Sequence, residues 1–264
     1  MADLKIISLL PAATEIVCAL GLKDQLIGRS HECDFPESVK KLPVCSSAKF
    51  ISGSNSAEID RQVKEILTNA LSIYTIDKDM IRNLAPDVII TQAQCEVCAV
   101  SLKDVEDALA GLLDKECRIV SLEPNVLSDV YNDIKTIAGI FGVSALAEDF
   151  LERDEERLNI IRHKLKFIGQ KPKVACIEWL SPLMIAGNWT PELVQIAGGE
   201  SILAVNGKHS PFVDFKDIQN EDPDIIIAMP CGFSIQRTMQ EISLLLDLRG
   251  WKDLKAVKLS LIHI

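Results

Sequence analysis

Histidine and cysteine side chains occur in two polar stretches, each of which follows an apolar run typical of a buried strand. His31 and Cys33 lie in the first stretch, and Cys95 and Cys98 form a Cys-x-x-Cys pair in the second. Thiolate and imidazole groups after strands are typical of thiol redox sites and of sites for soft metals. Because the carboxyl ends of parallel strands share one sheet edge, we expect these four residues to lie in one neighbourhood. One function that this pattern allows is a thiol- or metal-dependent enzyme.

The same residues also fit a site that performs no chemistry. The sequence contains a single Cys-x-x-Cys pair, and small polarisable thiols pack well in the wall of a ligand pocket. It contains no phosphate-binding P-loop, no dinucleotide fingerprint and no Gly-x-Ser-x-Gly motif. We therefore predict no catalytic residue and no resident metal.

Two of the three tryptophans, Trp179 and Trp189, lie on either side of Gly187 in one predicted loop. Large rigid rings beside a glycine suit a flat, weakly polar ligand. The alternative is that each ring anchors the loop in the core.

The composition indicates a soluble globular protein. The net charge of -10 disfavours binding to phosphate backbones and anionic membranes, so we expect no nucleic-acid partner. Eight cysteines in 264 residues are too few for a disulfide scaffold.

The amino-terminal sequence does not predict an export signal. The apolar run 6–10 is short, Pro11 interrupts it, and Glu15 follows. We expect the chain as given to be cytoplasmic, and periplasmic or at the cell surface if the N-terminus is incomplete.

The order of the expected elements indicates an α/β fold. Apolar runs predict strands at 5–10, 26–30, 72–75, 87–91, 118–122, 173–178 and 224–229. Amphipathic stretches predict helices at 12–20, 56–71, 77–84, 99–113, 128–141, 190–197, 214–220 and 234–248, and residues 37–55 and 179–188 are expected to be loops. This alternation predicts largely parallel sheets covered by helices.

Residues 144–169 form the longest predicted helix. Ser144 is suited to its N-cap, the middle at 152–157 is wholly charged, and the apolar residues lie towards both ends. Such a pattern fits a helix that packs on two separate bodies. It divides the chain into an N-terminal α/β lobe at 1–143, the linking helix, and a C-terminal α/β lobe at 170–264 that we expect to be truncated.

A Pro-Asp pattern that occurs once in each half of the chain supports two lobes of similar construction. Pro86-Asp87 and Pro223-Asp224 each precede an apolar run that is followed by a cysteine. The alternative is that this is a common junction between a helix and a strand in α/β proteins.

Several short motifs carry a family resemblance in combination. They are ISLLPAATE (7–15), HECD (31–34), TQ (91–92), CEVCAV (95–100), EW (178–179), AGNW (186–189), PE (191–192), AGG (197–199) and CGF (231–233). Together they resemble the cobalamin-binding proteins of the iron-siderophore and cobalamin periplasmic-binding family, from Lys5 to about Val257. The resemblance implies two Rossmann-like lobes with parallel sheets joined by one long helix, the class III arrangement.

The function implied by this resemblance is the binding of cobalamin or a related corrinoid in a cleft between the lobes, with a small hinge motion. Such a protein is a substrate-binding component of an ABC importer, or a soluble corrinoid-binding protein, and not an enzyme. A monomer is expected, with an ABC permease as a possible partner. Two departures from the family are the missing export signal and an unrelated tail after Lys258.

The resemblance also implies roles for individual residues. The ligand-binding candidates are Pro11, Ala12, Thr14, His31, Gln92, Cys95, Trp179, Asn188, Trp189 and Cys231. Backbone N–H groups of the first three would meet corrin amides, and His31 would face the cobalt or an amide. Gln92 and Cys95 would line the floor, and the two tryptophans would cover the ring. Acidic residues that start helices are the candidates for docking to a permease, namely Glu58, Asp77, Asp79, Asp214 and Asp217.

Overall fold

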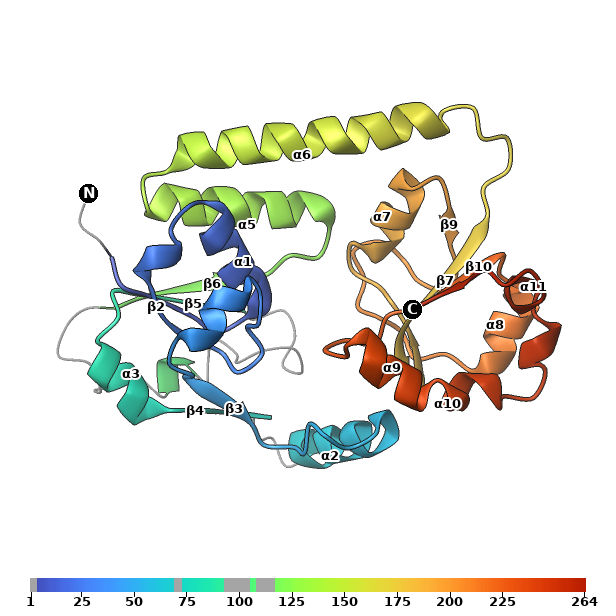
Figure 1. The fold of residues 1–264 in the computed structure, drawn as a ribbon, viewed down its shortest axis with the longest axis horizontal. Coiled ribbons are helices and arrows are strands. Elements are labelled where there is room, and N and C mark those ends of the chain that lie inside the picture. The colour runs from blue at the N-terminus through green and yellow to red at the C-terminus, as the bar shows by residue number, and fades with distance from the viewer. Residues whose placement is uncertain (1–3, 69–72, 93–104, 108–116) are drawn as a thin grey trace. The chain divides into compact units, whose positions relative to one another are not determined.

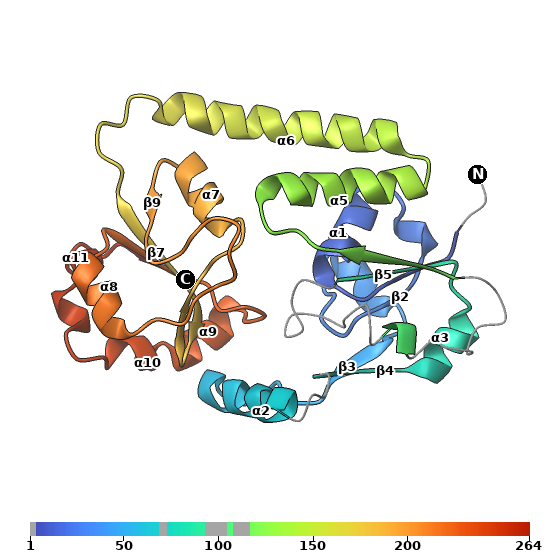
Figure 2. The same ribbon diagram turned by 180° about the vertical axis from the view of Figure 1, so that it is seen from behind.

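The structure is a computed structural model that describes residues 4–68, 73–92, 105–107 and 117–264 (Figures 1 and 2). The chain divides into two compact units. Unit 1 comprises Met1–Gly53, Arg61–Pro124 and Ser128–Glu152, and unit 2 comprises Ser54–Asp60, Asn125–Leu127 and Arg153–Ile264. Each unit contains its own mostly parallel sheet, so the predicted α/β fold with parallel sheets is confirmed.

The sheet of unit 1 has the strand order β2-β1-β5-β6, and all its pairs are parallel. Its strands are β1 (Ile6–Ser8), β2 (Leu26–Arg29), β5 (Val88–Gln92) and β6 (Arg118–Leu122). Helices α1 (Pro11–Ala19) and α5 (Leu127–Ile140) cover one face, where Val17 and Ile137 are fully buried (Figure 1). Helix α3 (Lys78–Leu84) lies on the other face, where Leu84 approaches Gly28 of β2. A sheet covered on both faces explains why all of β5 is apolar or buried.

A small hairpin in unit 1 corrects the prediction for residues 37–55. The stretch is not only a loop, because it holds a 3₁₀ helix at Glu37–Lys41 and strand β3 (Ser46–Ala48). Strand β3 pairs antiparallel with β4 (Tyr74–Ile76). Its sequence, Ser-Ser-Ala, has no apolar alternation, so its strand state depends on the partner strand and not on local preference. Helix α2 (Ser56–Thr68) lies between the two strands in sequence.

Unit 2 has a sheet in the order β11-β10-β7-β8, and β9 also pairs with β7. Its strands are β7 (Lys173–Leu180), β8 (Leu183–Ile185), β9 (Glu200–Ser201), β10 (Ile225–Ala228) and β11 (Ile262–His263). Alternate residues of β7 point to two cores. Ala175 and Ile177 pack with helices α8 (Phe215–Glu221), α10 (Ser243–Leu246) and α11 (Lys255–Lys258), whereas Val174 and Cys176 pack with Val194 of α7 (Thr190–Ile196).

Three predictions for unit 2 were wrong in detail. Trp179 does not open a loop, because β7 continues to Leu180 and β8 returns antiparallel beside it. Pro182 in the tight connection made this hairpin resemble a loop in the sequence. Trp189, and not Thr190, is the N-cap of α7. The predicted helix 234–248 is interrupted at Ile242, which separates α9 (Ile235–Glu241) from α10.

The repeated Pro-Asp pattern corresponds to the same connection between a helix and a strand in both units. Helix α3 is followed by the C-cap residue Ala85 and helix α8 by the C-cap residue Asp222, each in the left-handed conformation, with φ of 46° and 44°. The proline that follows prevents the helix from continuing, and the next aspartate accepts a backbone N–H at or just before the start of the unit's first strand. Asp87 Oδ2 is 2.8 Å from the backbone nitrogen of Lys5, and Asp224 Oδ2 is 2.8 Å from the backbone nitrogen of Lys173.

The longest described helix, α6 (Ser144–Leu165), begins at the predicted residue and ends earlier than predicted. Its first turns contribute Ala147 to the core of unit 1. Its other end brings Leu165 against the backbone of Gly198 in unit 2. The boundary between the units falls in the charged middle, after Glu152.

A pH-dependent stability is expected from Asp133 on α5. Burial raises the pKa of this carboxyl from 3.8 to about 6, and Asp129 and Glu123 add repulsion. The folded chain then binds this proton more tightly than the unfolded chain, so the free energy of unfolding falls as the pH rises from about 4 to 6 and above. Asp133→Asn should raise the Tm at pH 8 and change it little at pH 4. Thermal denaturation followed by circular dichroism measures both values.

The exposed Asp24 is a matched control for this experiment. Asp24→Asn should give no pH-dependent gain in Tm. An equal Tm gain for Asp133→Asn at both pH values would contradict the prediction.

Candidate functional site

The candidate residues of unit 1 gather at one edge of its sheet. Pro11, Ala12 and Thr14 begin α1 just after β1, His31 follows β2, and Gln92 ends β5. These strands are parallel neighbours, so their carboxyl ends lie side by side. This is the sheet edge at which α/β proteins bind ligands.

The start of α1 offers fewer backbone donors than predicted. Pro11 has no N–H, and the Thr14 N–H donates to the Leu10 carbonyl at 3.2 Å. Ala12 is exposed in the first turn, where an amide lacks a partner four residues earlier in the helix. Ala12 is therefore the best placed of the three predicted residues to donate to a ligand.

Thr14 and Cys33 face each other inside unit 1, and both are fully buried. The Thr14 hydroxyl lies 2.8 Å from Ser8 Oγ and 3.0 Å from Cys33 Sγ. Burial raises the pKa of the Cys33 thiol, and the hydrogen bond from Thr14 lowers it in part. A buried neutral thiol is a packing group, so Cys33 is poorly suited to attack a substrate.

His31 is also held within unit 1. Its Nδ1 is 3.0 Å from Ser46 Oγ, which is hydrogen-bonded in turn to Ser30 Oγ. Its Nε2 is buried and lies 3.2 Å from Glu32 Oε1, without the geometry of a hydrogen bond. The imidazole is 5.4 Å from the Tyr74 ring, measured between centroids. Both ring nitrogens therefore face groups of the protein.

An aromatic cluster occupies the corresponding sheet edge of unit 2. Trp179 is the second-last residue of β7, and its ring packs edge-on against Phe233 with centroids 5.2 Å apart. The guanidinium of Arg237 lies 3.7 Å from the centre of the Phe233 ring, a cation–π contact. Cys231 is exposed two residues before Phe233.

Trp179 of this cluster, and Arg237 and Glu241 of α9, also form hydrogen bonds with the backbone of residues 54–56, which belong to unit 2. Trp179 Nε1 donates to the Ser56 carbonyl at 3.2 Å, and Arg237 Nη2 donates to the Ser54 carbonyl at 2.7 Å. Glu241 Oε2 accepts the Ser56 N–H at 2.7 Å, at the first residue of α2. We call Trp179, Arg237 and Glu241 the α2 clamp. It fixes the start of α2 and the direction of the Trp179 ring.

Asn188 and Trp189 lie in the connection between β8 and α7. Asn188 has a φ of 50°, its N–H donates to the Lys208 carbonyl at 2.7 Å, and its carbonyl accepts the Gly207 N–H at 2.8 Å. Both residues are half-buried.

Cys95 and Cys98 lie outside the described residues, so the predicted neighbourhood of His31, Cys33, Cys95 and Cys98 stays a prediction. Among the residues that the structure describes, no group of three or more His, Cys, Asp or Glu side chains could hold a metal ion.

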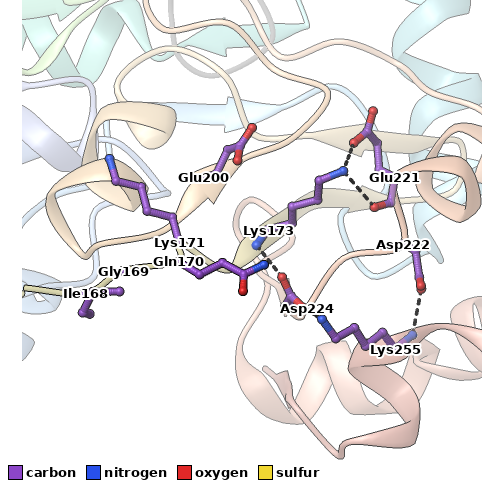
Figure 3. A pocket seen from close by; sticks show the side chains of 10 residues that line it. All are labelled: Ile168, Gly169, Gln170, Lys171, Lys173, Glu200, Glu221, Asp222, Asp224 and Lys255. Carbon is purple, nitrogen blue, oxygen red and sulfur yellow. Dashed lines mark hydrogen bonds and ion pairs between the residues drawn. The ribbon is translucent and has the colours of Figure 1, made fainter.

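A charged pocket of about 690 Å³ lies at the opposite, amino edge of the sheet of unit 2 (Figure 3). Two of its lysines are paired, since Lys173 Nζ is 2.8 Å from Glu221 Oε2 and Lys255 forms an ion pair with Asp224. The Lys255 ammonium, together with the Lys173 N–H, lowers the pKa of Asp224. None of the predicted ligand-binding residues lines this pocket.

Sequence reasoning assigned no role to Ser46, Ser210, Arg237 or Glu241. Arg237 and Glu241 are spaced four apart on a predicted helix, which places them on one face. Nothing in the sequence indicates that their partners are Ser54 and Ser56, which are more than 180 positions away.

Comparison with known proteins assigns the chain to a family. The family model described as periplasmic binding protein matches residues 6–260. The chain belongs to the periplasmic binding protein family. A vitamin B12-binding protein of Yersinia pestis (strain Pestoides F) is 25% identical to this periplasmic binding protein over 226 residues, 84% of this chain and 68% of the relative.

Solved structures of the same fold include proteins named for different ligands. The periplasmic vitamin B12 binding protein BtuF of Vibrio cholerae has a TM-score of 0.64 and 20% identity, over 98% of this chain and 86% of its own. The periplasmic heme-binding protein RhuT from Roseiflexus sp. RS-1 has a TM-score of 0.70 and 17% identity, over 98% of this chain and 88% of its own. These likenesses confirm the fold and leave the ligand open.

Family membership decides between the two functional classes that the sequence allowed. This periplasmic binding protein is a binding protein and not an enzyme. No helix in the described part of the chain is long and apolar enough to cross a membrane.

The α2 clamp is testable through Glu241. Glu241→Ala removes a carboxylate from the positive end of α2, which should lower the free energy of unfolding by about 1 kcal/mol. Backbone amides in Ser54–Asp60 should then exchange faster with deuterium, as measured by mass spectrometry. Gln240→Ala, at the exposed neighbouring position, is the control and should leave the exchange unchanged. Unaltered exchange in Glu241→Ala would mean that the clamp does not hold this segment.

Proposed function

We propose that this periplasmic binding protein binds a corrinoid such as cobalamin. The observation that carries the proposal is the similarity to a vitamin B12-binding protein over 84% of the chain. The aromatic cluster of Trp179 and Phe233 supports it, because ring faces and edges at a sheet's ligand-binding edge suit a large flat macrocycle. The cleft between lobes that the resemblance implies for the ligand stays a prediction.

The surroundings of His31 favour a corrinoid over heme. Heme iron is generally held by an axial side chain of the protein, such as histidine or tyrosine. The Nδ1 of His31 faces Ser46, and its buried Nε2 faces Glu32. Cobalamin carries its own lower axial base, so a protein that binds it requires no free imidazole. For His31 to donate to a corrin amide, as the resemblance implies, one of its ring nitrogens would have to leave Ser46 or Glu32.

We further propose that the protein delivers its ligand to an ABC permease. A similar solved structure, from Listeria monocytogenes EGD-e, is named as an ABC transporter substrate-binding protein and supports this role. Among the predicted docking residues, Asp77, Asp214 and Asp217 already accept backbone N–H groups at the starts of their own helices. Asp79 is exposed on α3, and its surface ion pair with Arg82 contributes little to stability, so it is better suited to docking than these three capping residues. A periplasmic or cell-surface location follows from this role as part of the proposal.

Calorimetric titration of the purified protein with cyanocobalamin, and separately with hemin, tests the ligand. Cyanocobalamin should bind at one per chain, and more tightly than hemin. Tighter binding of hemin would replace the corrinoid proposal by heme binding, and binding of neither would overturn both.

Substitution of Trp189 tests the residue assignment. Trp189→Ala removes a large aromatic face and should weaken cyanocobalamin binding by on the order of 1 to 3 kcal/mol, roughly 5- to 150-fold. Phe167→Ala removes an aromatic ring that is 87% exposed on unit 2 and serves as the control. Equal affinities of Trp189→Ala and the control would remove Trp189 from the site.

A further inference from the structure

Glu178 connects the segments of unit 2 that carry the candidate ligand-binding residues. It precedes Trp179 on β7, and its backbone carbonyl accepts the Cys231 N–H at 3.1 Å. Its side chain points to another segment, because Oε2 accepts the Ser210 hydroxyl at 2.7 Å. One residue therefore contacts both the 230–233 turn and the 207–211 segment.

Ser210 extends this connection to the loop that carries Asn188 and Trp189. Its side chain is buried, and Oγ accepts the Gly187 N–H at 2.9 Å. The single hydroxyl proton is directed at the Glu178 carboxylate, so a lone pair remains for the Gly187 amide. The resulting chain from N–H to O–H to carboxylate is polarised in one direction, and its charged end strengthens each bond.

The packing at Gly187 shows how closely these segments are joined. A Cβ atom at this position would lie 2.4 Å from the Lys208 carbonyl oxygen and 2.7 Å from the Ser210 nitrogen. The two backbones are thus in direct contact, which only glycine permits. The hydrogen bonds of Asn188 with Lys208 and Gly207 continue the contact up to the residue before Trp189.

We infer that Glu178 is a positioning residue, which acts through Ser210 and Gly187 to orient Asn188 and Trp189 for the ligand. The inference rests on the proposed function, in which Trp189 contacts the corrinoid. Glu178 needs no contact with the ligand itself. Loss of the carboxylate would leave the Ser210 hydroxyl without its acceptor and loosen the loop at Gly187.

Ligand affinity is the first measurement. Calorimetric titration with cyanocobalamin should show a loss of about tenfold or more for Glu178→Ala and for Ser210→Ala, since each breaks a bond to a charged group. The double variant should lose little more than the worse single variant, because both remove the same chain. Glu178→Gln retains an acceptor oxygen and should recover most of the affinity.

A double-mutant cycle separates positioning from general destabilisation. In a Trp189→Ala background, Ser210→Ala should cost clearly less affinity than in the wild-type protein, because the part of its effect that passes through Trp189 is already lost. Thr238→Val is the matched control, since it removes another buried hydroxyl of unit 2, which donates to the Ser234 carbonyl at 3.0 Å. It should lower the Tm without changing the affinity. Equal losses for Ser210→Ala in both backgrounds, or wild-type affinity in Ser210→Ala, would overturn the inference.

Deuterium exchange in the absence of ligand tests the positioning role of Glu178 separately from the proposed function. Deuterium exchange of the peptide 186–190 should accelerate in Ser210→Ala and in Glu178→Ala, and stay unchanged in Thr238→Val. Unchanged exchange in the first two variants overturns the positioning role whatever the ligand is. Accelerated exchange in a protein that binds no cyanocobalamin would instead reject only the corrinoid proposal.

Discussion

Both units depend on the same connection, in which an aspartate after a helix-ending proline accepts a backbone N–H at or just before the start of the unit's first strand. Asp87 binds the Lys5 amide and Asp224 binds the Lys173 amide, both at 2.8 Å. The connection fixes where β1 starts beside β5 and where β7 starts beside β10. Once the amino ends are aligned in this way, the carboxyl ends of parallel strands must emerge together at the other edge. In each sheet the candidate residues lie at that carboxyl edge, after β1 and β2 or at the end of β5 in unit 1, and at the end of β7 or after β10 in unit 2.

The polar groups at these edges are largely used within the units themselves. His31 faces Ser46 and Glu32, and the Thr14 hydroxyl faces Ser8 and Cys33. In unit 2 the indole N–H of Trp179 binds the Ser56 carbonyl. Each edge is thus held in shape by bonds within its own unit, with exposed residues such as Ala12 in unit 1 and packed rings such as Trp179 in unit 2. Preorganisation of this kind lowers the entropic cost of binding a ligand.

Among the described residues, the sequence was sufficient to locate the long elements and the sheet edges, but not the partners of the site residues. The predicted helix 99–113 lies largely outside the described residues and stays a prediction. Strand β6 was predicted with its observed bounds, because an apolar run of this length has a clear pattern. Strands β3 and β9 were missed, because two or three residues rich in Ser and Glu show no periodicity. Trp179 was assigned to a loop, because the proline of the following turn obscured the hairpin. The bonds between Glu178 and Ser210 and between Glu241 and Ser56 join residues far apart in sequence, and no local pattern encodes them.

The state of the buried thiols bears on the remaining alternative, a soft metal bound by cysteines. Burial raises the pKa of Cys33, and it raises the pKa values of Cys45 and Cys176 to about 11. A metal must displace the proton of each thiol that it binds, and a raised pKa makes this displacement more costly. Cys33 would also have to leave its contact with Thr14 inside the core of unit 1. These described thiols therefore favour a packing role, in agreement with membership of a family of binding proteins.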